Sequence, residues 1–247
     1  MQITIDGKAC SCEKGEYVLE VARRNGIVIP TLCHHPAVPG RGCCRVCLVE
    51  ATEHGRTKVV TACVYPVKEG LEVQTDTKRI REERSMVLAF MEKRARESER
   101  IRDLCKIYHA PDVVRIADGE TTRCILCGLC VTACRALGTG AIAAIDRGID
   151  KRIATPYDNP SAECIGCGSC AHICPTGNIT YEDDAETRTI WKRTFTLARC
   201  EECGEVIGTE EEFAYAAGLS GLDEVPRLCP SCRRHHDAQS IKAALGA

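Results

Sequence analysis

The 247-residue sequence is poor in aromatic side chains and contains no long apolar run. Aromatic residues make up 4% of the chain, with one Trp, three Phe and six Tyr, so large rings can fill little of a core. No run of eighteen apolar residues could span a bilayer, and the start, MQITIDGKACSC, lacks the basic and apolar segments of a signal peptide. We therefore expect a cytoplasmic protein without a membrane span.

The sequence also lacks an excess of charge of either sign. Its 33 basic and 35 acidic side chains leave a net charge of −2, which gives no global field to attract nucleic acid or anionic lipid. The expected partners are therefore proteins and not nucleic acids.

Cysteine is the residue that the sequence has in abundance, with 20 in the chain. In the cytosol thiols stay reduced, so cysteines at short spacing are more often metal ligands than disulfides. Bound metal is thus expected to help hold together a chain that has few large side chains for its core.

Two runs of four cysteines share the spacing C-x2-C-x2-C-x3-C and begin 40 residues apart. At this spacing three thiolates can hold one iron–sulfur cube, while the fourth, turned away by the helix that it starts, reaches the other cube. Two zinc sites or a disulfide knot are the alternatives, and two copies with identical spacing favour the clusters. The predicted ligand sets are therefore crossed: Cys124, Cys127, Cys130 and Cys174 for one [4Fe-4S] cluster, and Cys134, Cys164, Cys167 and Cys170 for the second.

A third group of cysteines lies near the N-terminus and has the spacing C-x10-C-x2-C-x15-C. The plant-type ferredoxin loop has C-x4-C-x2-C and a distant fourth cysteine, so this is the same arrangement with a longer first spacer. Cys43 could replace Cys44, but Cys44 gives the expected spacing. The pattern predicts a [2Fe-2S] cluster held by Cys33, Cys44, Cys47 and Cys63.

A fourth group consists of two C-x2-C pairs separated by 25 residues. Such pairs close a tetrahedral site of four sulfurs, which can staple a segment too small for its own core. Zinc is favoured over a single iron ion, and a further iron–sulfur cluster is a third interpretation. The acidic surroundings EECGEVIGTEEEF argue against a nucleic-acid role. The predicted ligands of this metal site are Cys200, Cys203, Cys229 and Cys232, while Cys10, Cys12, Cys43 and Cys105 are left without a ligand role.

The pattern of apolar residues predicts a small α+β domain at the N-terminus. Alternation at Ile3 and Ile5, an Asp-Gly turn and a helical pattern from Val18 give strand, strand and helix. Three further strand-like runs, within 47–52, 58–67 and 71–75, end near Thr77. Residues 78–109 contain neither Gly nor Pro and predict two amphipathic helices with a solvated charged face.

Four motifs together resemble one protein family: GCCRVCLVE, TACVYPVKEGLEV, TTRCILCGLCVTACRALGTGAI and ECIGCGSCAHICPTGNI. They closely resemble the iron–sulfur relay subunit of NAD(P)-linked multisubunit hydrogenases, a relative of the N-terminal part of iron-only hydrogenase and of the large peripheral iron–sulfur subunit of respiratory complex I. The resemblance covers roughly residues 1–182.

The resemblance implies an α+β fold built from successive domains. A β-grasp [2Fe-2S] ferredoxin domain is expected over residues 1–77, a helical connector over 78–117, and a bacterial-ferredoxin-like 2[4Fe-4S] domain over 118–190. The cysteine pairs add a small zinc-ribbon-like element over 191–247. Many members of the family carry one more cluster in the connector, held by H-x3-C-x2-C-x5-C. Here the connector offers only Cys105 and His109, so the expected relay has one cluster fewer.

The sequence carries no flavin, dinucleotide or P-loop motif for bond-making chemistry. Clusters with four cysteine ligands leave no open coordination position, so they can accept and pass single electrons. The predicted function is electron transfer between a flavin/NAD(H) module and a hydrogenase module, with no catalysis by this chain alone.

The resemblance implies four kinds of partner: a flavoprotein NAD(H) subunit, a thioredoxin-like [2Fe-2S] subunit, hydrogenase catalytic subunits and a ferredoxin. It also implies that such a complex can bifurcate electrons. The same relay in an NAD-linked formate dehydrogenase, and an iron–sulfur redox-sensing regulator, are the alternative functions.

Overall fold

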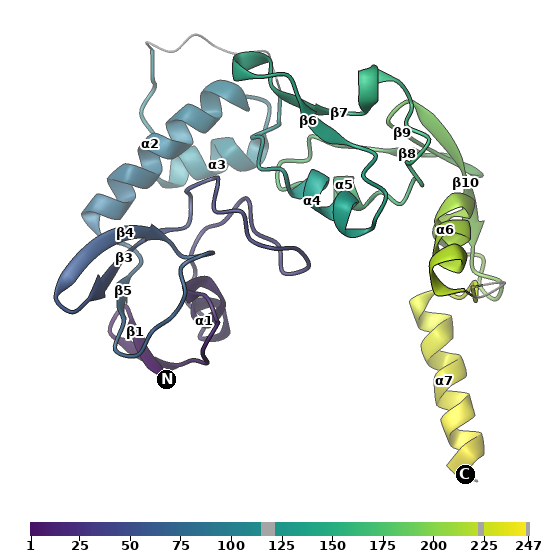
Figure 1. Cartoon of the computed structure of the whole chain (residues 1–247), viewed down its shortest axis with the longest axis horizontal. Helices are drawn as coiled ribbons and strands as arrows, with labels where there is room; N and C mark the ends of the chain where they lie inside the picture. The colour runs from purple at the N-terminus through teal and green to yellow at the C-terminus, as the bar shows by residue number, and fades with distance from the viewer. Residues whose placement is uncertain (115–121, 222–224, 246–247) are drawn as a thin grey trace. The chain divides into compact units, whose positions relative to one another are not determined.

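The fold is that of a computed structural model, which describes residues 1–114, 122–221 and 225–245 (Figure 1). The predicted boundary between residues 117 and 118 lies outside the described residues. The chain divides into two compact units. The first takes Met1–Ala133, Ala144–Ile153 and Ile173–Asn178, and the second takes Cys134–Ala143, Ala154–His172 and Ile179–Ala247.

The N-terminal part forms a mixed sheet with the strand order β2-β1-β5-β3-β4. Strand β1 pairs parallel to β5, and the other neighbours are antiparallel. The β1–β2 hairpin turns at Asp6-Gly7 and the β3–β4 hairpin at His54-Gly55, with positive φ at all four residues, as two-residue turns of this kind require. The elements are β1 (Gln2–Ile5), β2 (Lys8–Ser11), α1 (Val18–Arg24), β3 (Leu48–Glu53), β4 (Arg56–Thr61) and β5 (Glu72–Gln74).

Helix α1 packs its apolar face against this sheet. Because side chains alternate along a strand, Ile3 and Ile5 point to the same face, where they join Leu19 of the helix in one buried cluster. Cys10 and Cys12 belong to the same cluster, and each thiol donates to a nearby main-chain carbonyl. These two cysteines therefore pack as small apolar side chains in the domain core.

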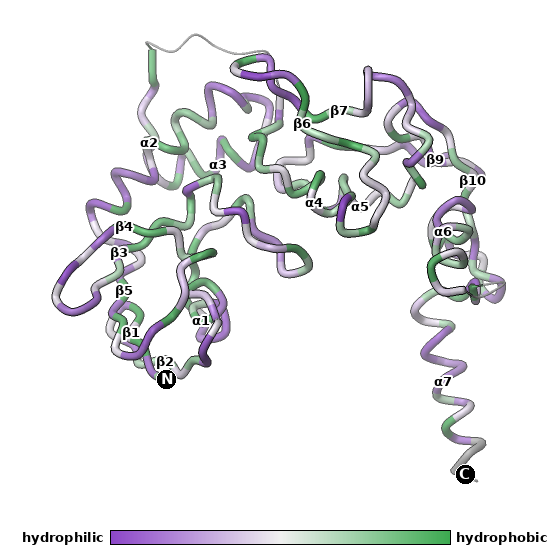
Figure 2. The backbone as a smooth tube through the Cα atoms, in the orientation of Figure 1, coloured by the Kyte–Doolittle hydropathy of each residue, from purple (hydrophilic) through white to green (hydrophobic). Residues whose placement is uncertain are grey.

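The connector forms the two predicted helices, α2 (Lys78–Arg94) and α3 (Glu99–Ile107). Each begins at a capping side chain: the N–H of Ile80 donates to Thr77 Oγ1 at 3.2 Å, and the N–H of Ile101 to Ser98 Oγ at 3.4 Å. Figure 2 shows hydrophobic residues interrupting the hydrophilic ones along α2, as an amphipathic helix requires.

Arg84 departs from the expectation that the charged residues of the connector are solvated. It is 1% exposed, and its guanidinium donates to the carbonyl oxygens of Val46 at 2.9 Å, Leu48 at 2.8 Å and Thr75 at 3.3 Å. The same group lies 4.8 Å from the ring centroid of Tyr108. Arg84 thus fastens both helices to the sheet domain.

The two cysteine runs are joined by short elements. In the first run α4 (Leu129–Ala136) begins one residue before the third cysteine, Cys130, whereas we expected a helix to begin at the fourth. Cys134 therefore lies one helical turn further along. The elements that follow are β6 (Ala143–Ile145), η1 (Gly148–Asp150), β7 (Arg152–Ala154), η2 (Pro156–Asp158) and α5 (Ser169–His172), with β6 paired to β7.

The C-terminal part is built on an antiparallel sheet with the strand order β11-β10-β9-β8. Trp191 and Lys192, both at positive φ, form the β9–β10 turn, which lies at the predicted boundary between residues 190 and 191. Among the described residues no helix is both long enough and apolar enough to cross a membrane. The elements are β8 (Glu182–Asp183), β9 (Thr187–Ile190), β10 (Arg193–Arg199), β11 (Val206–Thr209), α6 (Glu210–Ser220) and α7 (Pro230–Leu245).

Candidate iron–sulfur sites

Two of the predicted [2Fe-2S] ligands lie at one end of the β3–β4 hairpin. Cys47 directly precedes β3, and Cys63 follows β4. The register pairs Leu48 with Thr61, and the N–H of Ala62 donates to the carbonyl oxygen of Cys47 at 3.0 Å. The pairing of the two strands therefore brings together two cysteines that are distant in the sequence.

The other two ligands, Cys33 and Cys44, come from the loop between α1 and β3. The N–H of Cys44 donates to Cys33 Sγ at 3.4 Å. The thiols of Cys43, Cys44 and Cys63 also face this sulfur. These contacts lower the pKa of Cys33 far below its ordinary value and raise the pKa values of the three facing thiols. A thiolate is the form of cysteine that binds iron, and all four predicted ligands are buried, so this pocket suits a cluster. Cys43, which is exposed, lies beside the group.

The first predicted cubane set draws on both cysteine runs, and Asn178 links the two segments. Its side-chain Oδ1 accepts a hydrogen bond from Thr122 Oγ1 at 3.1 Å, and its main-chain N–H donates to Cys174 Sγ at 3.3 Å. The N–H of Leu126 donates to Cys124 Sγ at 3.4 Å. Main-chain amides that point at sulfur are typical of cluster ligands, because they stabilise negative charge there.

Burial and neighbouring thiols act on the remaining ligands of this first set. They raise the pKa of Cys127 to about 11 and that of Cys130 to about 12, and Cys174 is among the charges that contribute in both cases. Cys174, the last cysteine of the second run, also falls in the same compact unit as Cys127 and Cys130.

The second predicted cubane set surrounds a small cavity in the second unit. The N–H of Ala141 donates to Cys134 Sγ at 3.2 Å, and Thr139 Oγ1 lies 3.2 Å from the same sulfur. The indole N–H of Trp191 donates to Cys170 Sγ at 3.4 Å. Among the residues that line the cavity are all four predicted ligands, Cys134, Cys164, Cys167 and Cys170.

Strand β10 fixes the loop of the second run, which the sequence analysis did not anticipate. Arg193 Nη1 donates to the carbonyl oxygens of Ser161, Ala162 and Cys164 at 3.0, 2.9 and 2.8 Å. Gly166 has a φ of +69°, and a Cβ at this position would lie 2.6 Å from the ring of Phe195. No local pattern in the sequence marks Arg193 or Phe195 for these contacts.

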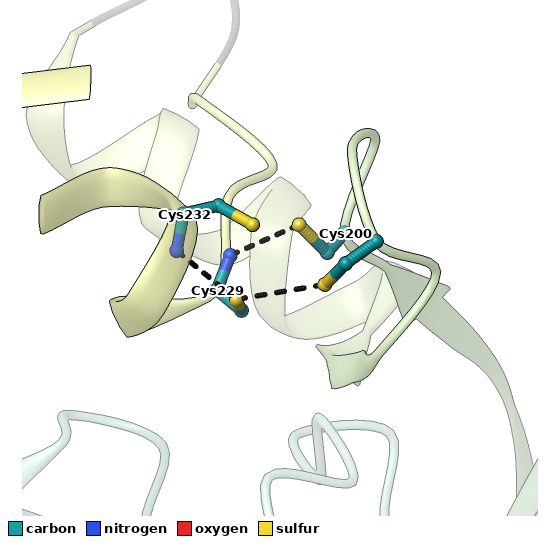
Figure 3. Close-up of side chains that lie close together, drawn as sticks. Cys200, Cys229 and Cys232 are labelled. Carbon is teal, nitrogen blue, oxygen red and sulfur yellow. Dashed lines mark hydrogen bonds between the residues drawn. The ribbon is translucent and has the colours of Figure 1, made fainter. Parts of the chain in front are cut away.

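The four C-terminal cysteines form the tightest thiol group in the described part of the chain. Their sulfurs all lie within 4.8 Å of one another, and Cys203 Sγ is 3.7 Å from Cys229 Sγ. Figure 3 shows the side chains of Cys200, Cys229 and Cys232 pointing toward one another. A tetrahedral zinc ion with Zn–S bonds of about 2.3 Å holds its sulfurs about 3.8 Å apart. The observed spacing thus fits a single tetrahedral ion.

Main-chain groups prepare this site for a metal ion. The first pair lies between β10 and β11, and the second begins α7. The N–H groups of Cys203 and Cys229 lower the pKa of the Cys200 thiol to about 6, which favours the thiolate, whereas contacts with neighbouring thiols raise the pKa values of Cys203 and Cys232. His236 is paired with Glu202 instead of pointing at the sulfurs.

Comparison with known proteins finds two iron–sulfur domain families and several oxidoreductase subunits. The 2Fe-2S iron-sulfur cluster binding domain family matches residues 1–78, and the 4Fe-4S dicluster domain family matches residues 163–207. The chain is 29% identical over 230 residues to a subunit of the NADH-quinone oxidoreductase of Rhizobium meliloti, covering 83% of this chain and 27% of the relative. It is 30% identical over 231 residues to the NADPH-Fe(3+) oxidoreductase subunit alpha of Geobacter sulfurreducens. That match covers 82% of this chain and 26% of the relative.

The chain is a homologue of these oxidoreductase subunits. A solved structure, that of an NAD+-reducing [NiFe]-hydrogenase in the H2-reduced state, has a TM-score of 0.59 and 26% identity, and the match covers 72% of this chain and 85% of that one. The chain spans about a quarter of the length of the two curated relatives.

The family matches cover the cysteine groups unequally. Residues 1–78 include the whole [2Fe-2S] group, and residues 163–207 include the second run together with Cys200 and Cys203. The first run lies outside both matches. The thiols, amide donors and burial described above are what the chain itself offers for iron–sulfur binding.

Proposed function

We propose that this chain is an electron-transfer subunit of an NAD(P)-linked oxidoreductase complex. One [2Fe-2S] and two [4Fe-4S] clusters, when bound, would accept and release single electrons. The observation that carries the proposal is the gathering of cysteine thiols into separate groups of four, each supplied with main-chain N–H donors. Four cysteines saturate a cluster and leave no position for substrate, so passing electrons is the function that such sites serve.

The two cubane sites are proposed to have the crossed ligand sets. Two observations support this assignment. All four ligands of the first set fall in the first compact unit, and all four ligands of the second set fall in the second unit. In addition, the cavity in the second unit is lined by Cys134 from the first run, not by Cys174 from its own. An uncrossed arrangement would require Cys134 to move from the second unit to the first cubane site, and Cys174 to move from the first unit to the second cubane site.

The C-terminal group is proposed to hold one zinc ion. The short distances among its sulfurs support this choice, because an iron–sulfur cluster places four iron-bound sulfurs around a larger body than a single ion. The dicluster family match, which extends to residue 207, favours a further cluster as the second candidate. Cys232→Ser separates the two: we expect it to remove zinc and leave the iron content unchanged, and a loss of iron together with sulfide would support the cluster.

The proposed partners are those that the family resemblance of the cysteine motifs implies. They are a flavoprotein subunit that binds NAD(H), a thioredoxin-like [2Fe-2S] subunit and hydrogenase catalytic subunits, with a ferredoxin as a further electron carrier. Support comes from an NADPH-linked relative and from the structure of an NAD+-reducing [NiFe]-hydrogenase. A cytoplasmic location and electron bifurcation are part of the same proposal.

The proposal is tested by metal analysis and EPR on this chain isolated without oxygen, and by activity measurements on the complex. We expect about ten irons and one zinc per chain, and three cluster signals in a reductive titration. Cys127→Ser should impair electron flow between NAD(H) and the terminal enzyme, and leave the flavin subunit's reduction of a dye by NADH intact. Active material without iron, or equal loss of both activities, would refute the relay function. Nickel in the complex supports a hydrogenase, whereas molybdenum or tungsten would indicate a formate dehydrogenase.

A further inference from the structure

A short loop, Gly40 to Cys44, contacts both the N-terminal cysteine group and the first cysteine run. We call it the 40–44 loop. It ends at the predicted [2Fe-2S] ligand Cys44, and the Cys43 thiol donates to the carbonyl oxygen of Cys127 at 3.4 Å. From the same loop, Arg41 Nη1 donates to Thr132 Oγ1 at 3.0 Å. The loop therefore has two polar contacts with the segment that carries the first cubane ligands.

Gly128 allows the 40–44 loop to come this close. It has a φ of +73°, and a Cβ at this position would lie 3.0 Å from Arg41 Cζ and 3.1 Å from Arg41 Nε. Any side chain at residue 128 would push the guanidinium away and would also strain the backbone. The Arg41 guanidinium thus lies directly against the backbone next to Cys127.

The two ligand groups also share one apolar core. Cys33 and Cys44 of the N-terminal group and Cys127 of the first run belong to the same buried cluster. Leu88 of α2 and Leu104 of α3 complete that cluster from the connector. The helices therefore pack against both ligand groups and hold them together, in a connector that offers too few ligands for a cluster of its own.

We propose that Cys43 and Arg41 of the 40–44 loop position the [2Fe-2S] site against the first [4Fe-4S] site, and that they thereby set the electronic coupling between the two sites. From ligand Cys44 to ligand Cys127 a path runs through the peptide bond to Cys43, along its side chain and across one hydrogen bond of 3.4 Å. The rate of electron tunnelling falls steeply with distance and with gaps between bonded atoms, so this path favours a direct step. One electron moves, and no bond forms or breaks.

Cys43 and Arg41 are positioning residues in this proposal. Cys43 supplies the single non-covalent contact of the path. Arg41 fixes the loop on the first run, and its positive charge favours the added electron at that end. The inference rests on the proposed function, because it requires that both sites hold their clusters.

The first test is EPR relaxation of the reduced [2Fe-2S] signal in the full chain prepared without oxygen. A nearby paramagnetic cluster speeds relaxation, so we expect fast relaxation in the wild type and in Cys167→Ser, which alters the second cubane site. In Cys127→Ser the enhancement should be lost. Enhancement that survives Cys127→Ser, or that is lost only in Cys167→Ser, would overturn the direct step. Iron and sulfide counts tell the failures apart: absent clusters contradict the proposed function, whereas clusters without coupling contradict the inference alone.

The second test leaves every predicted ligand in place. We expect the double variant Arg41→Ala with Cys43→Ala to keep its iron and sulfide and to show slower [2Fe-2S] relaxation. The single variant Cys43→Ser keeps Arg41, and its hydroxyl can still donate to the Cys127 carbonyl. It should therefore show the relaxation of the wild type. Cys10→Ala is the matched control, because that thiol contacts a carbonyl of its own strand and should leave the coupling unchanged. Wild-type relaxation in the double variant would show that the loop does not position the two sites.

Discussion

Replacing Gly166 by alanine should weaken the second cubane site more than an alanine at an open glycine would. The new Cβ would lie 2.6, 2.8 and 3.0 Å from three ring atoms of Phe195, distances at which something must move. Phe195 is 1% exposed and cannot turn out into solvent. Gly166 also has a φ of +69°, a backbone conformation that disfavours any side chain.

The two effects can be estimated separately. The left-handed backbone costs about 1–2 kcal/mol for alanine. Overpacking against a buried ring costs about 1–3 kcal/mol. We therefore expect Gly166→Ala to destabilise the second unit by about 2–5 kcal/mol. Gly140 in the same unit has a φ of +60° and no atom within 4 Å of the position that a Cβ would take, so Gly140→Ala should incur the backbone cost alone.

The assay is thermal unfolding at one fixed heating rate, followed by the loss of cluster absorbance in anaerobic samples, because such unfolding is irreversible. Gly166→Ala should unfold at a clearly lower temperature than Gly140→Ala. Adding Phe195→Leu to Gly166→Ala should recover part of the loss, since a smaller side chain leaves room for the methyl group. Equal midpoints for the two single variants would refute the steric argument.

Three further substitutions test contacts that join distant segments. Arg84→Met removes the hydrogen-bond donors of three main-chain carbonyls. Each buried polar group left unpaired costs about 1–3 kcal/mol, so we expect thermal unfolding to show a destabilisation of at least about 3 kcal/mol. An unfolding midpoint like that of the wild type would contradict this. Thr209→Val removes the cap of α6 and the bond to the Ile165 carbonyl, and should cost about 1–2 kcal/mol by the same assay, whereas Thr209→Ser should recover much of it. Trp191→Phe removes an N–H donor to Cys170. If that hydrogen bond is about 1 kcal/mol stronger in the reduced state of the cluster, its loss should lower the reduction potential of the second [4Fe-4S] site by about 40 mV, measured by EPR redox titration. An unchanged or higher potential would show that the indole does not act on the cluster.

The sequence was informative about the cysteines because metal-ligand spacing is a local property of the chain. It predicted the strands and the first helix of the N-terminal domain for a similar reason, since alternation and Asp-Gly turns are read within a few residues. It also predicted the two connector helices, α2 and α3, from an uninterrupted helical pattern.

The residues that position the sites could not be predicted in this way. Asn178 meets Thr122 across 56 residues of sequence, and Arg84 meets Val46 across 38. The residues next to Asn178 and Arg84 in the sequence form no pattern that predicts such a contact. Arg84 in particular lies within a charged helix, where a solvated side chain is the ordinary outcome, and only its three carbonyl partners explain why it is buried.

The return of residues 173–178 to the first unit sets an order of events during synthesis. At about 5–20 residues per second, this segment is made about 2–9 s after Ala133, the last residue of the unit's main stretch. During that interval the nascent chain would present Cys124, Cys127 and Cys130 without Cys174, the proposed fourth ligand of this set. A thiol trio of this kind is open to oxidation and to the wrong metal, so iron delivery to this site should follow the synthesis of residues 173–178.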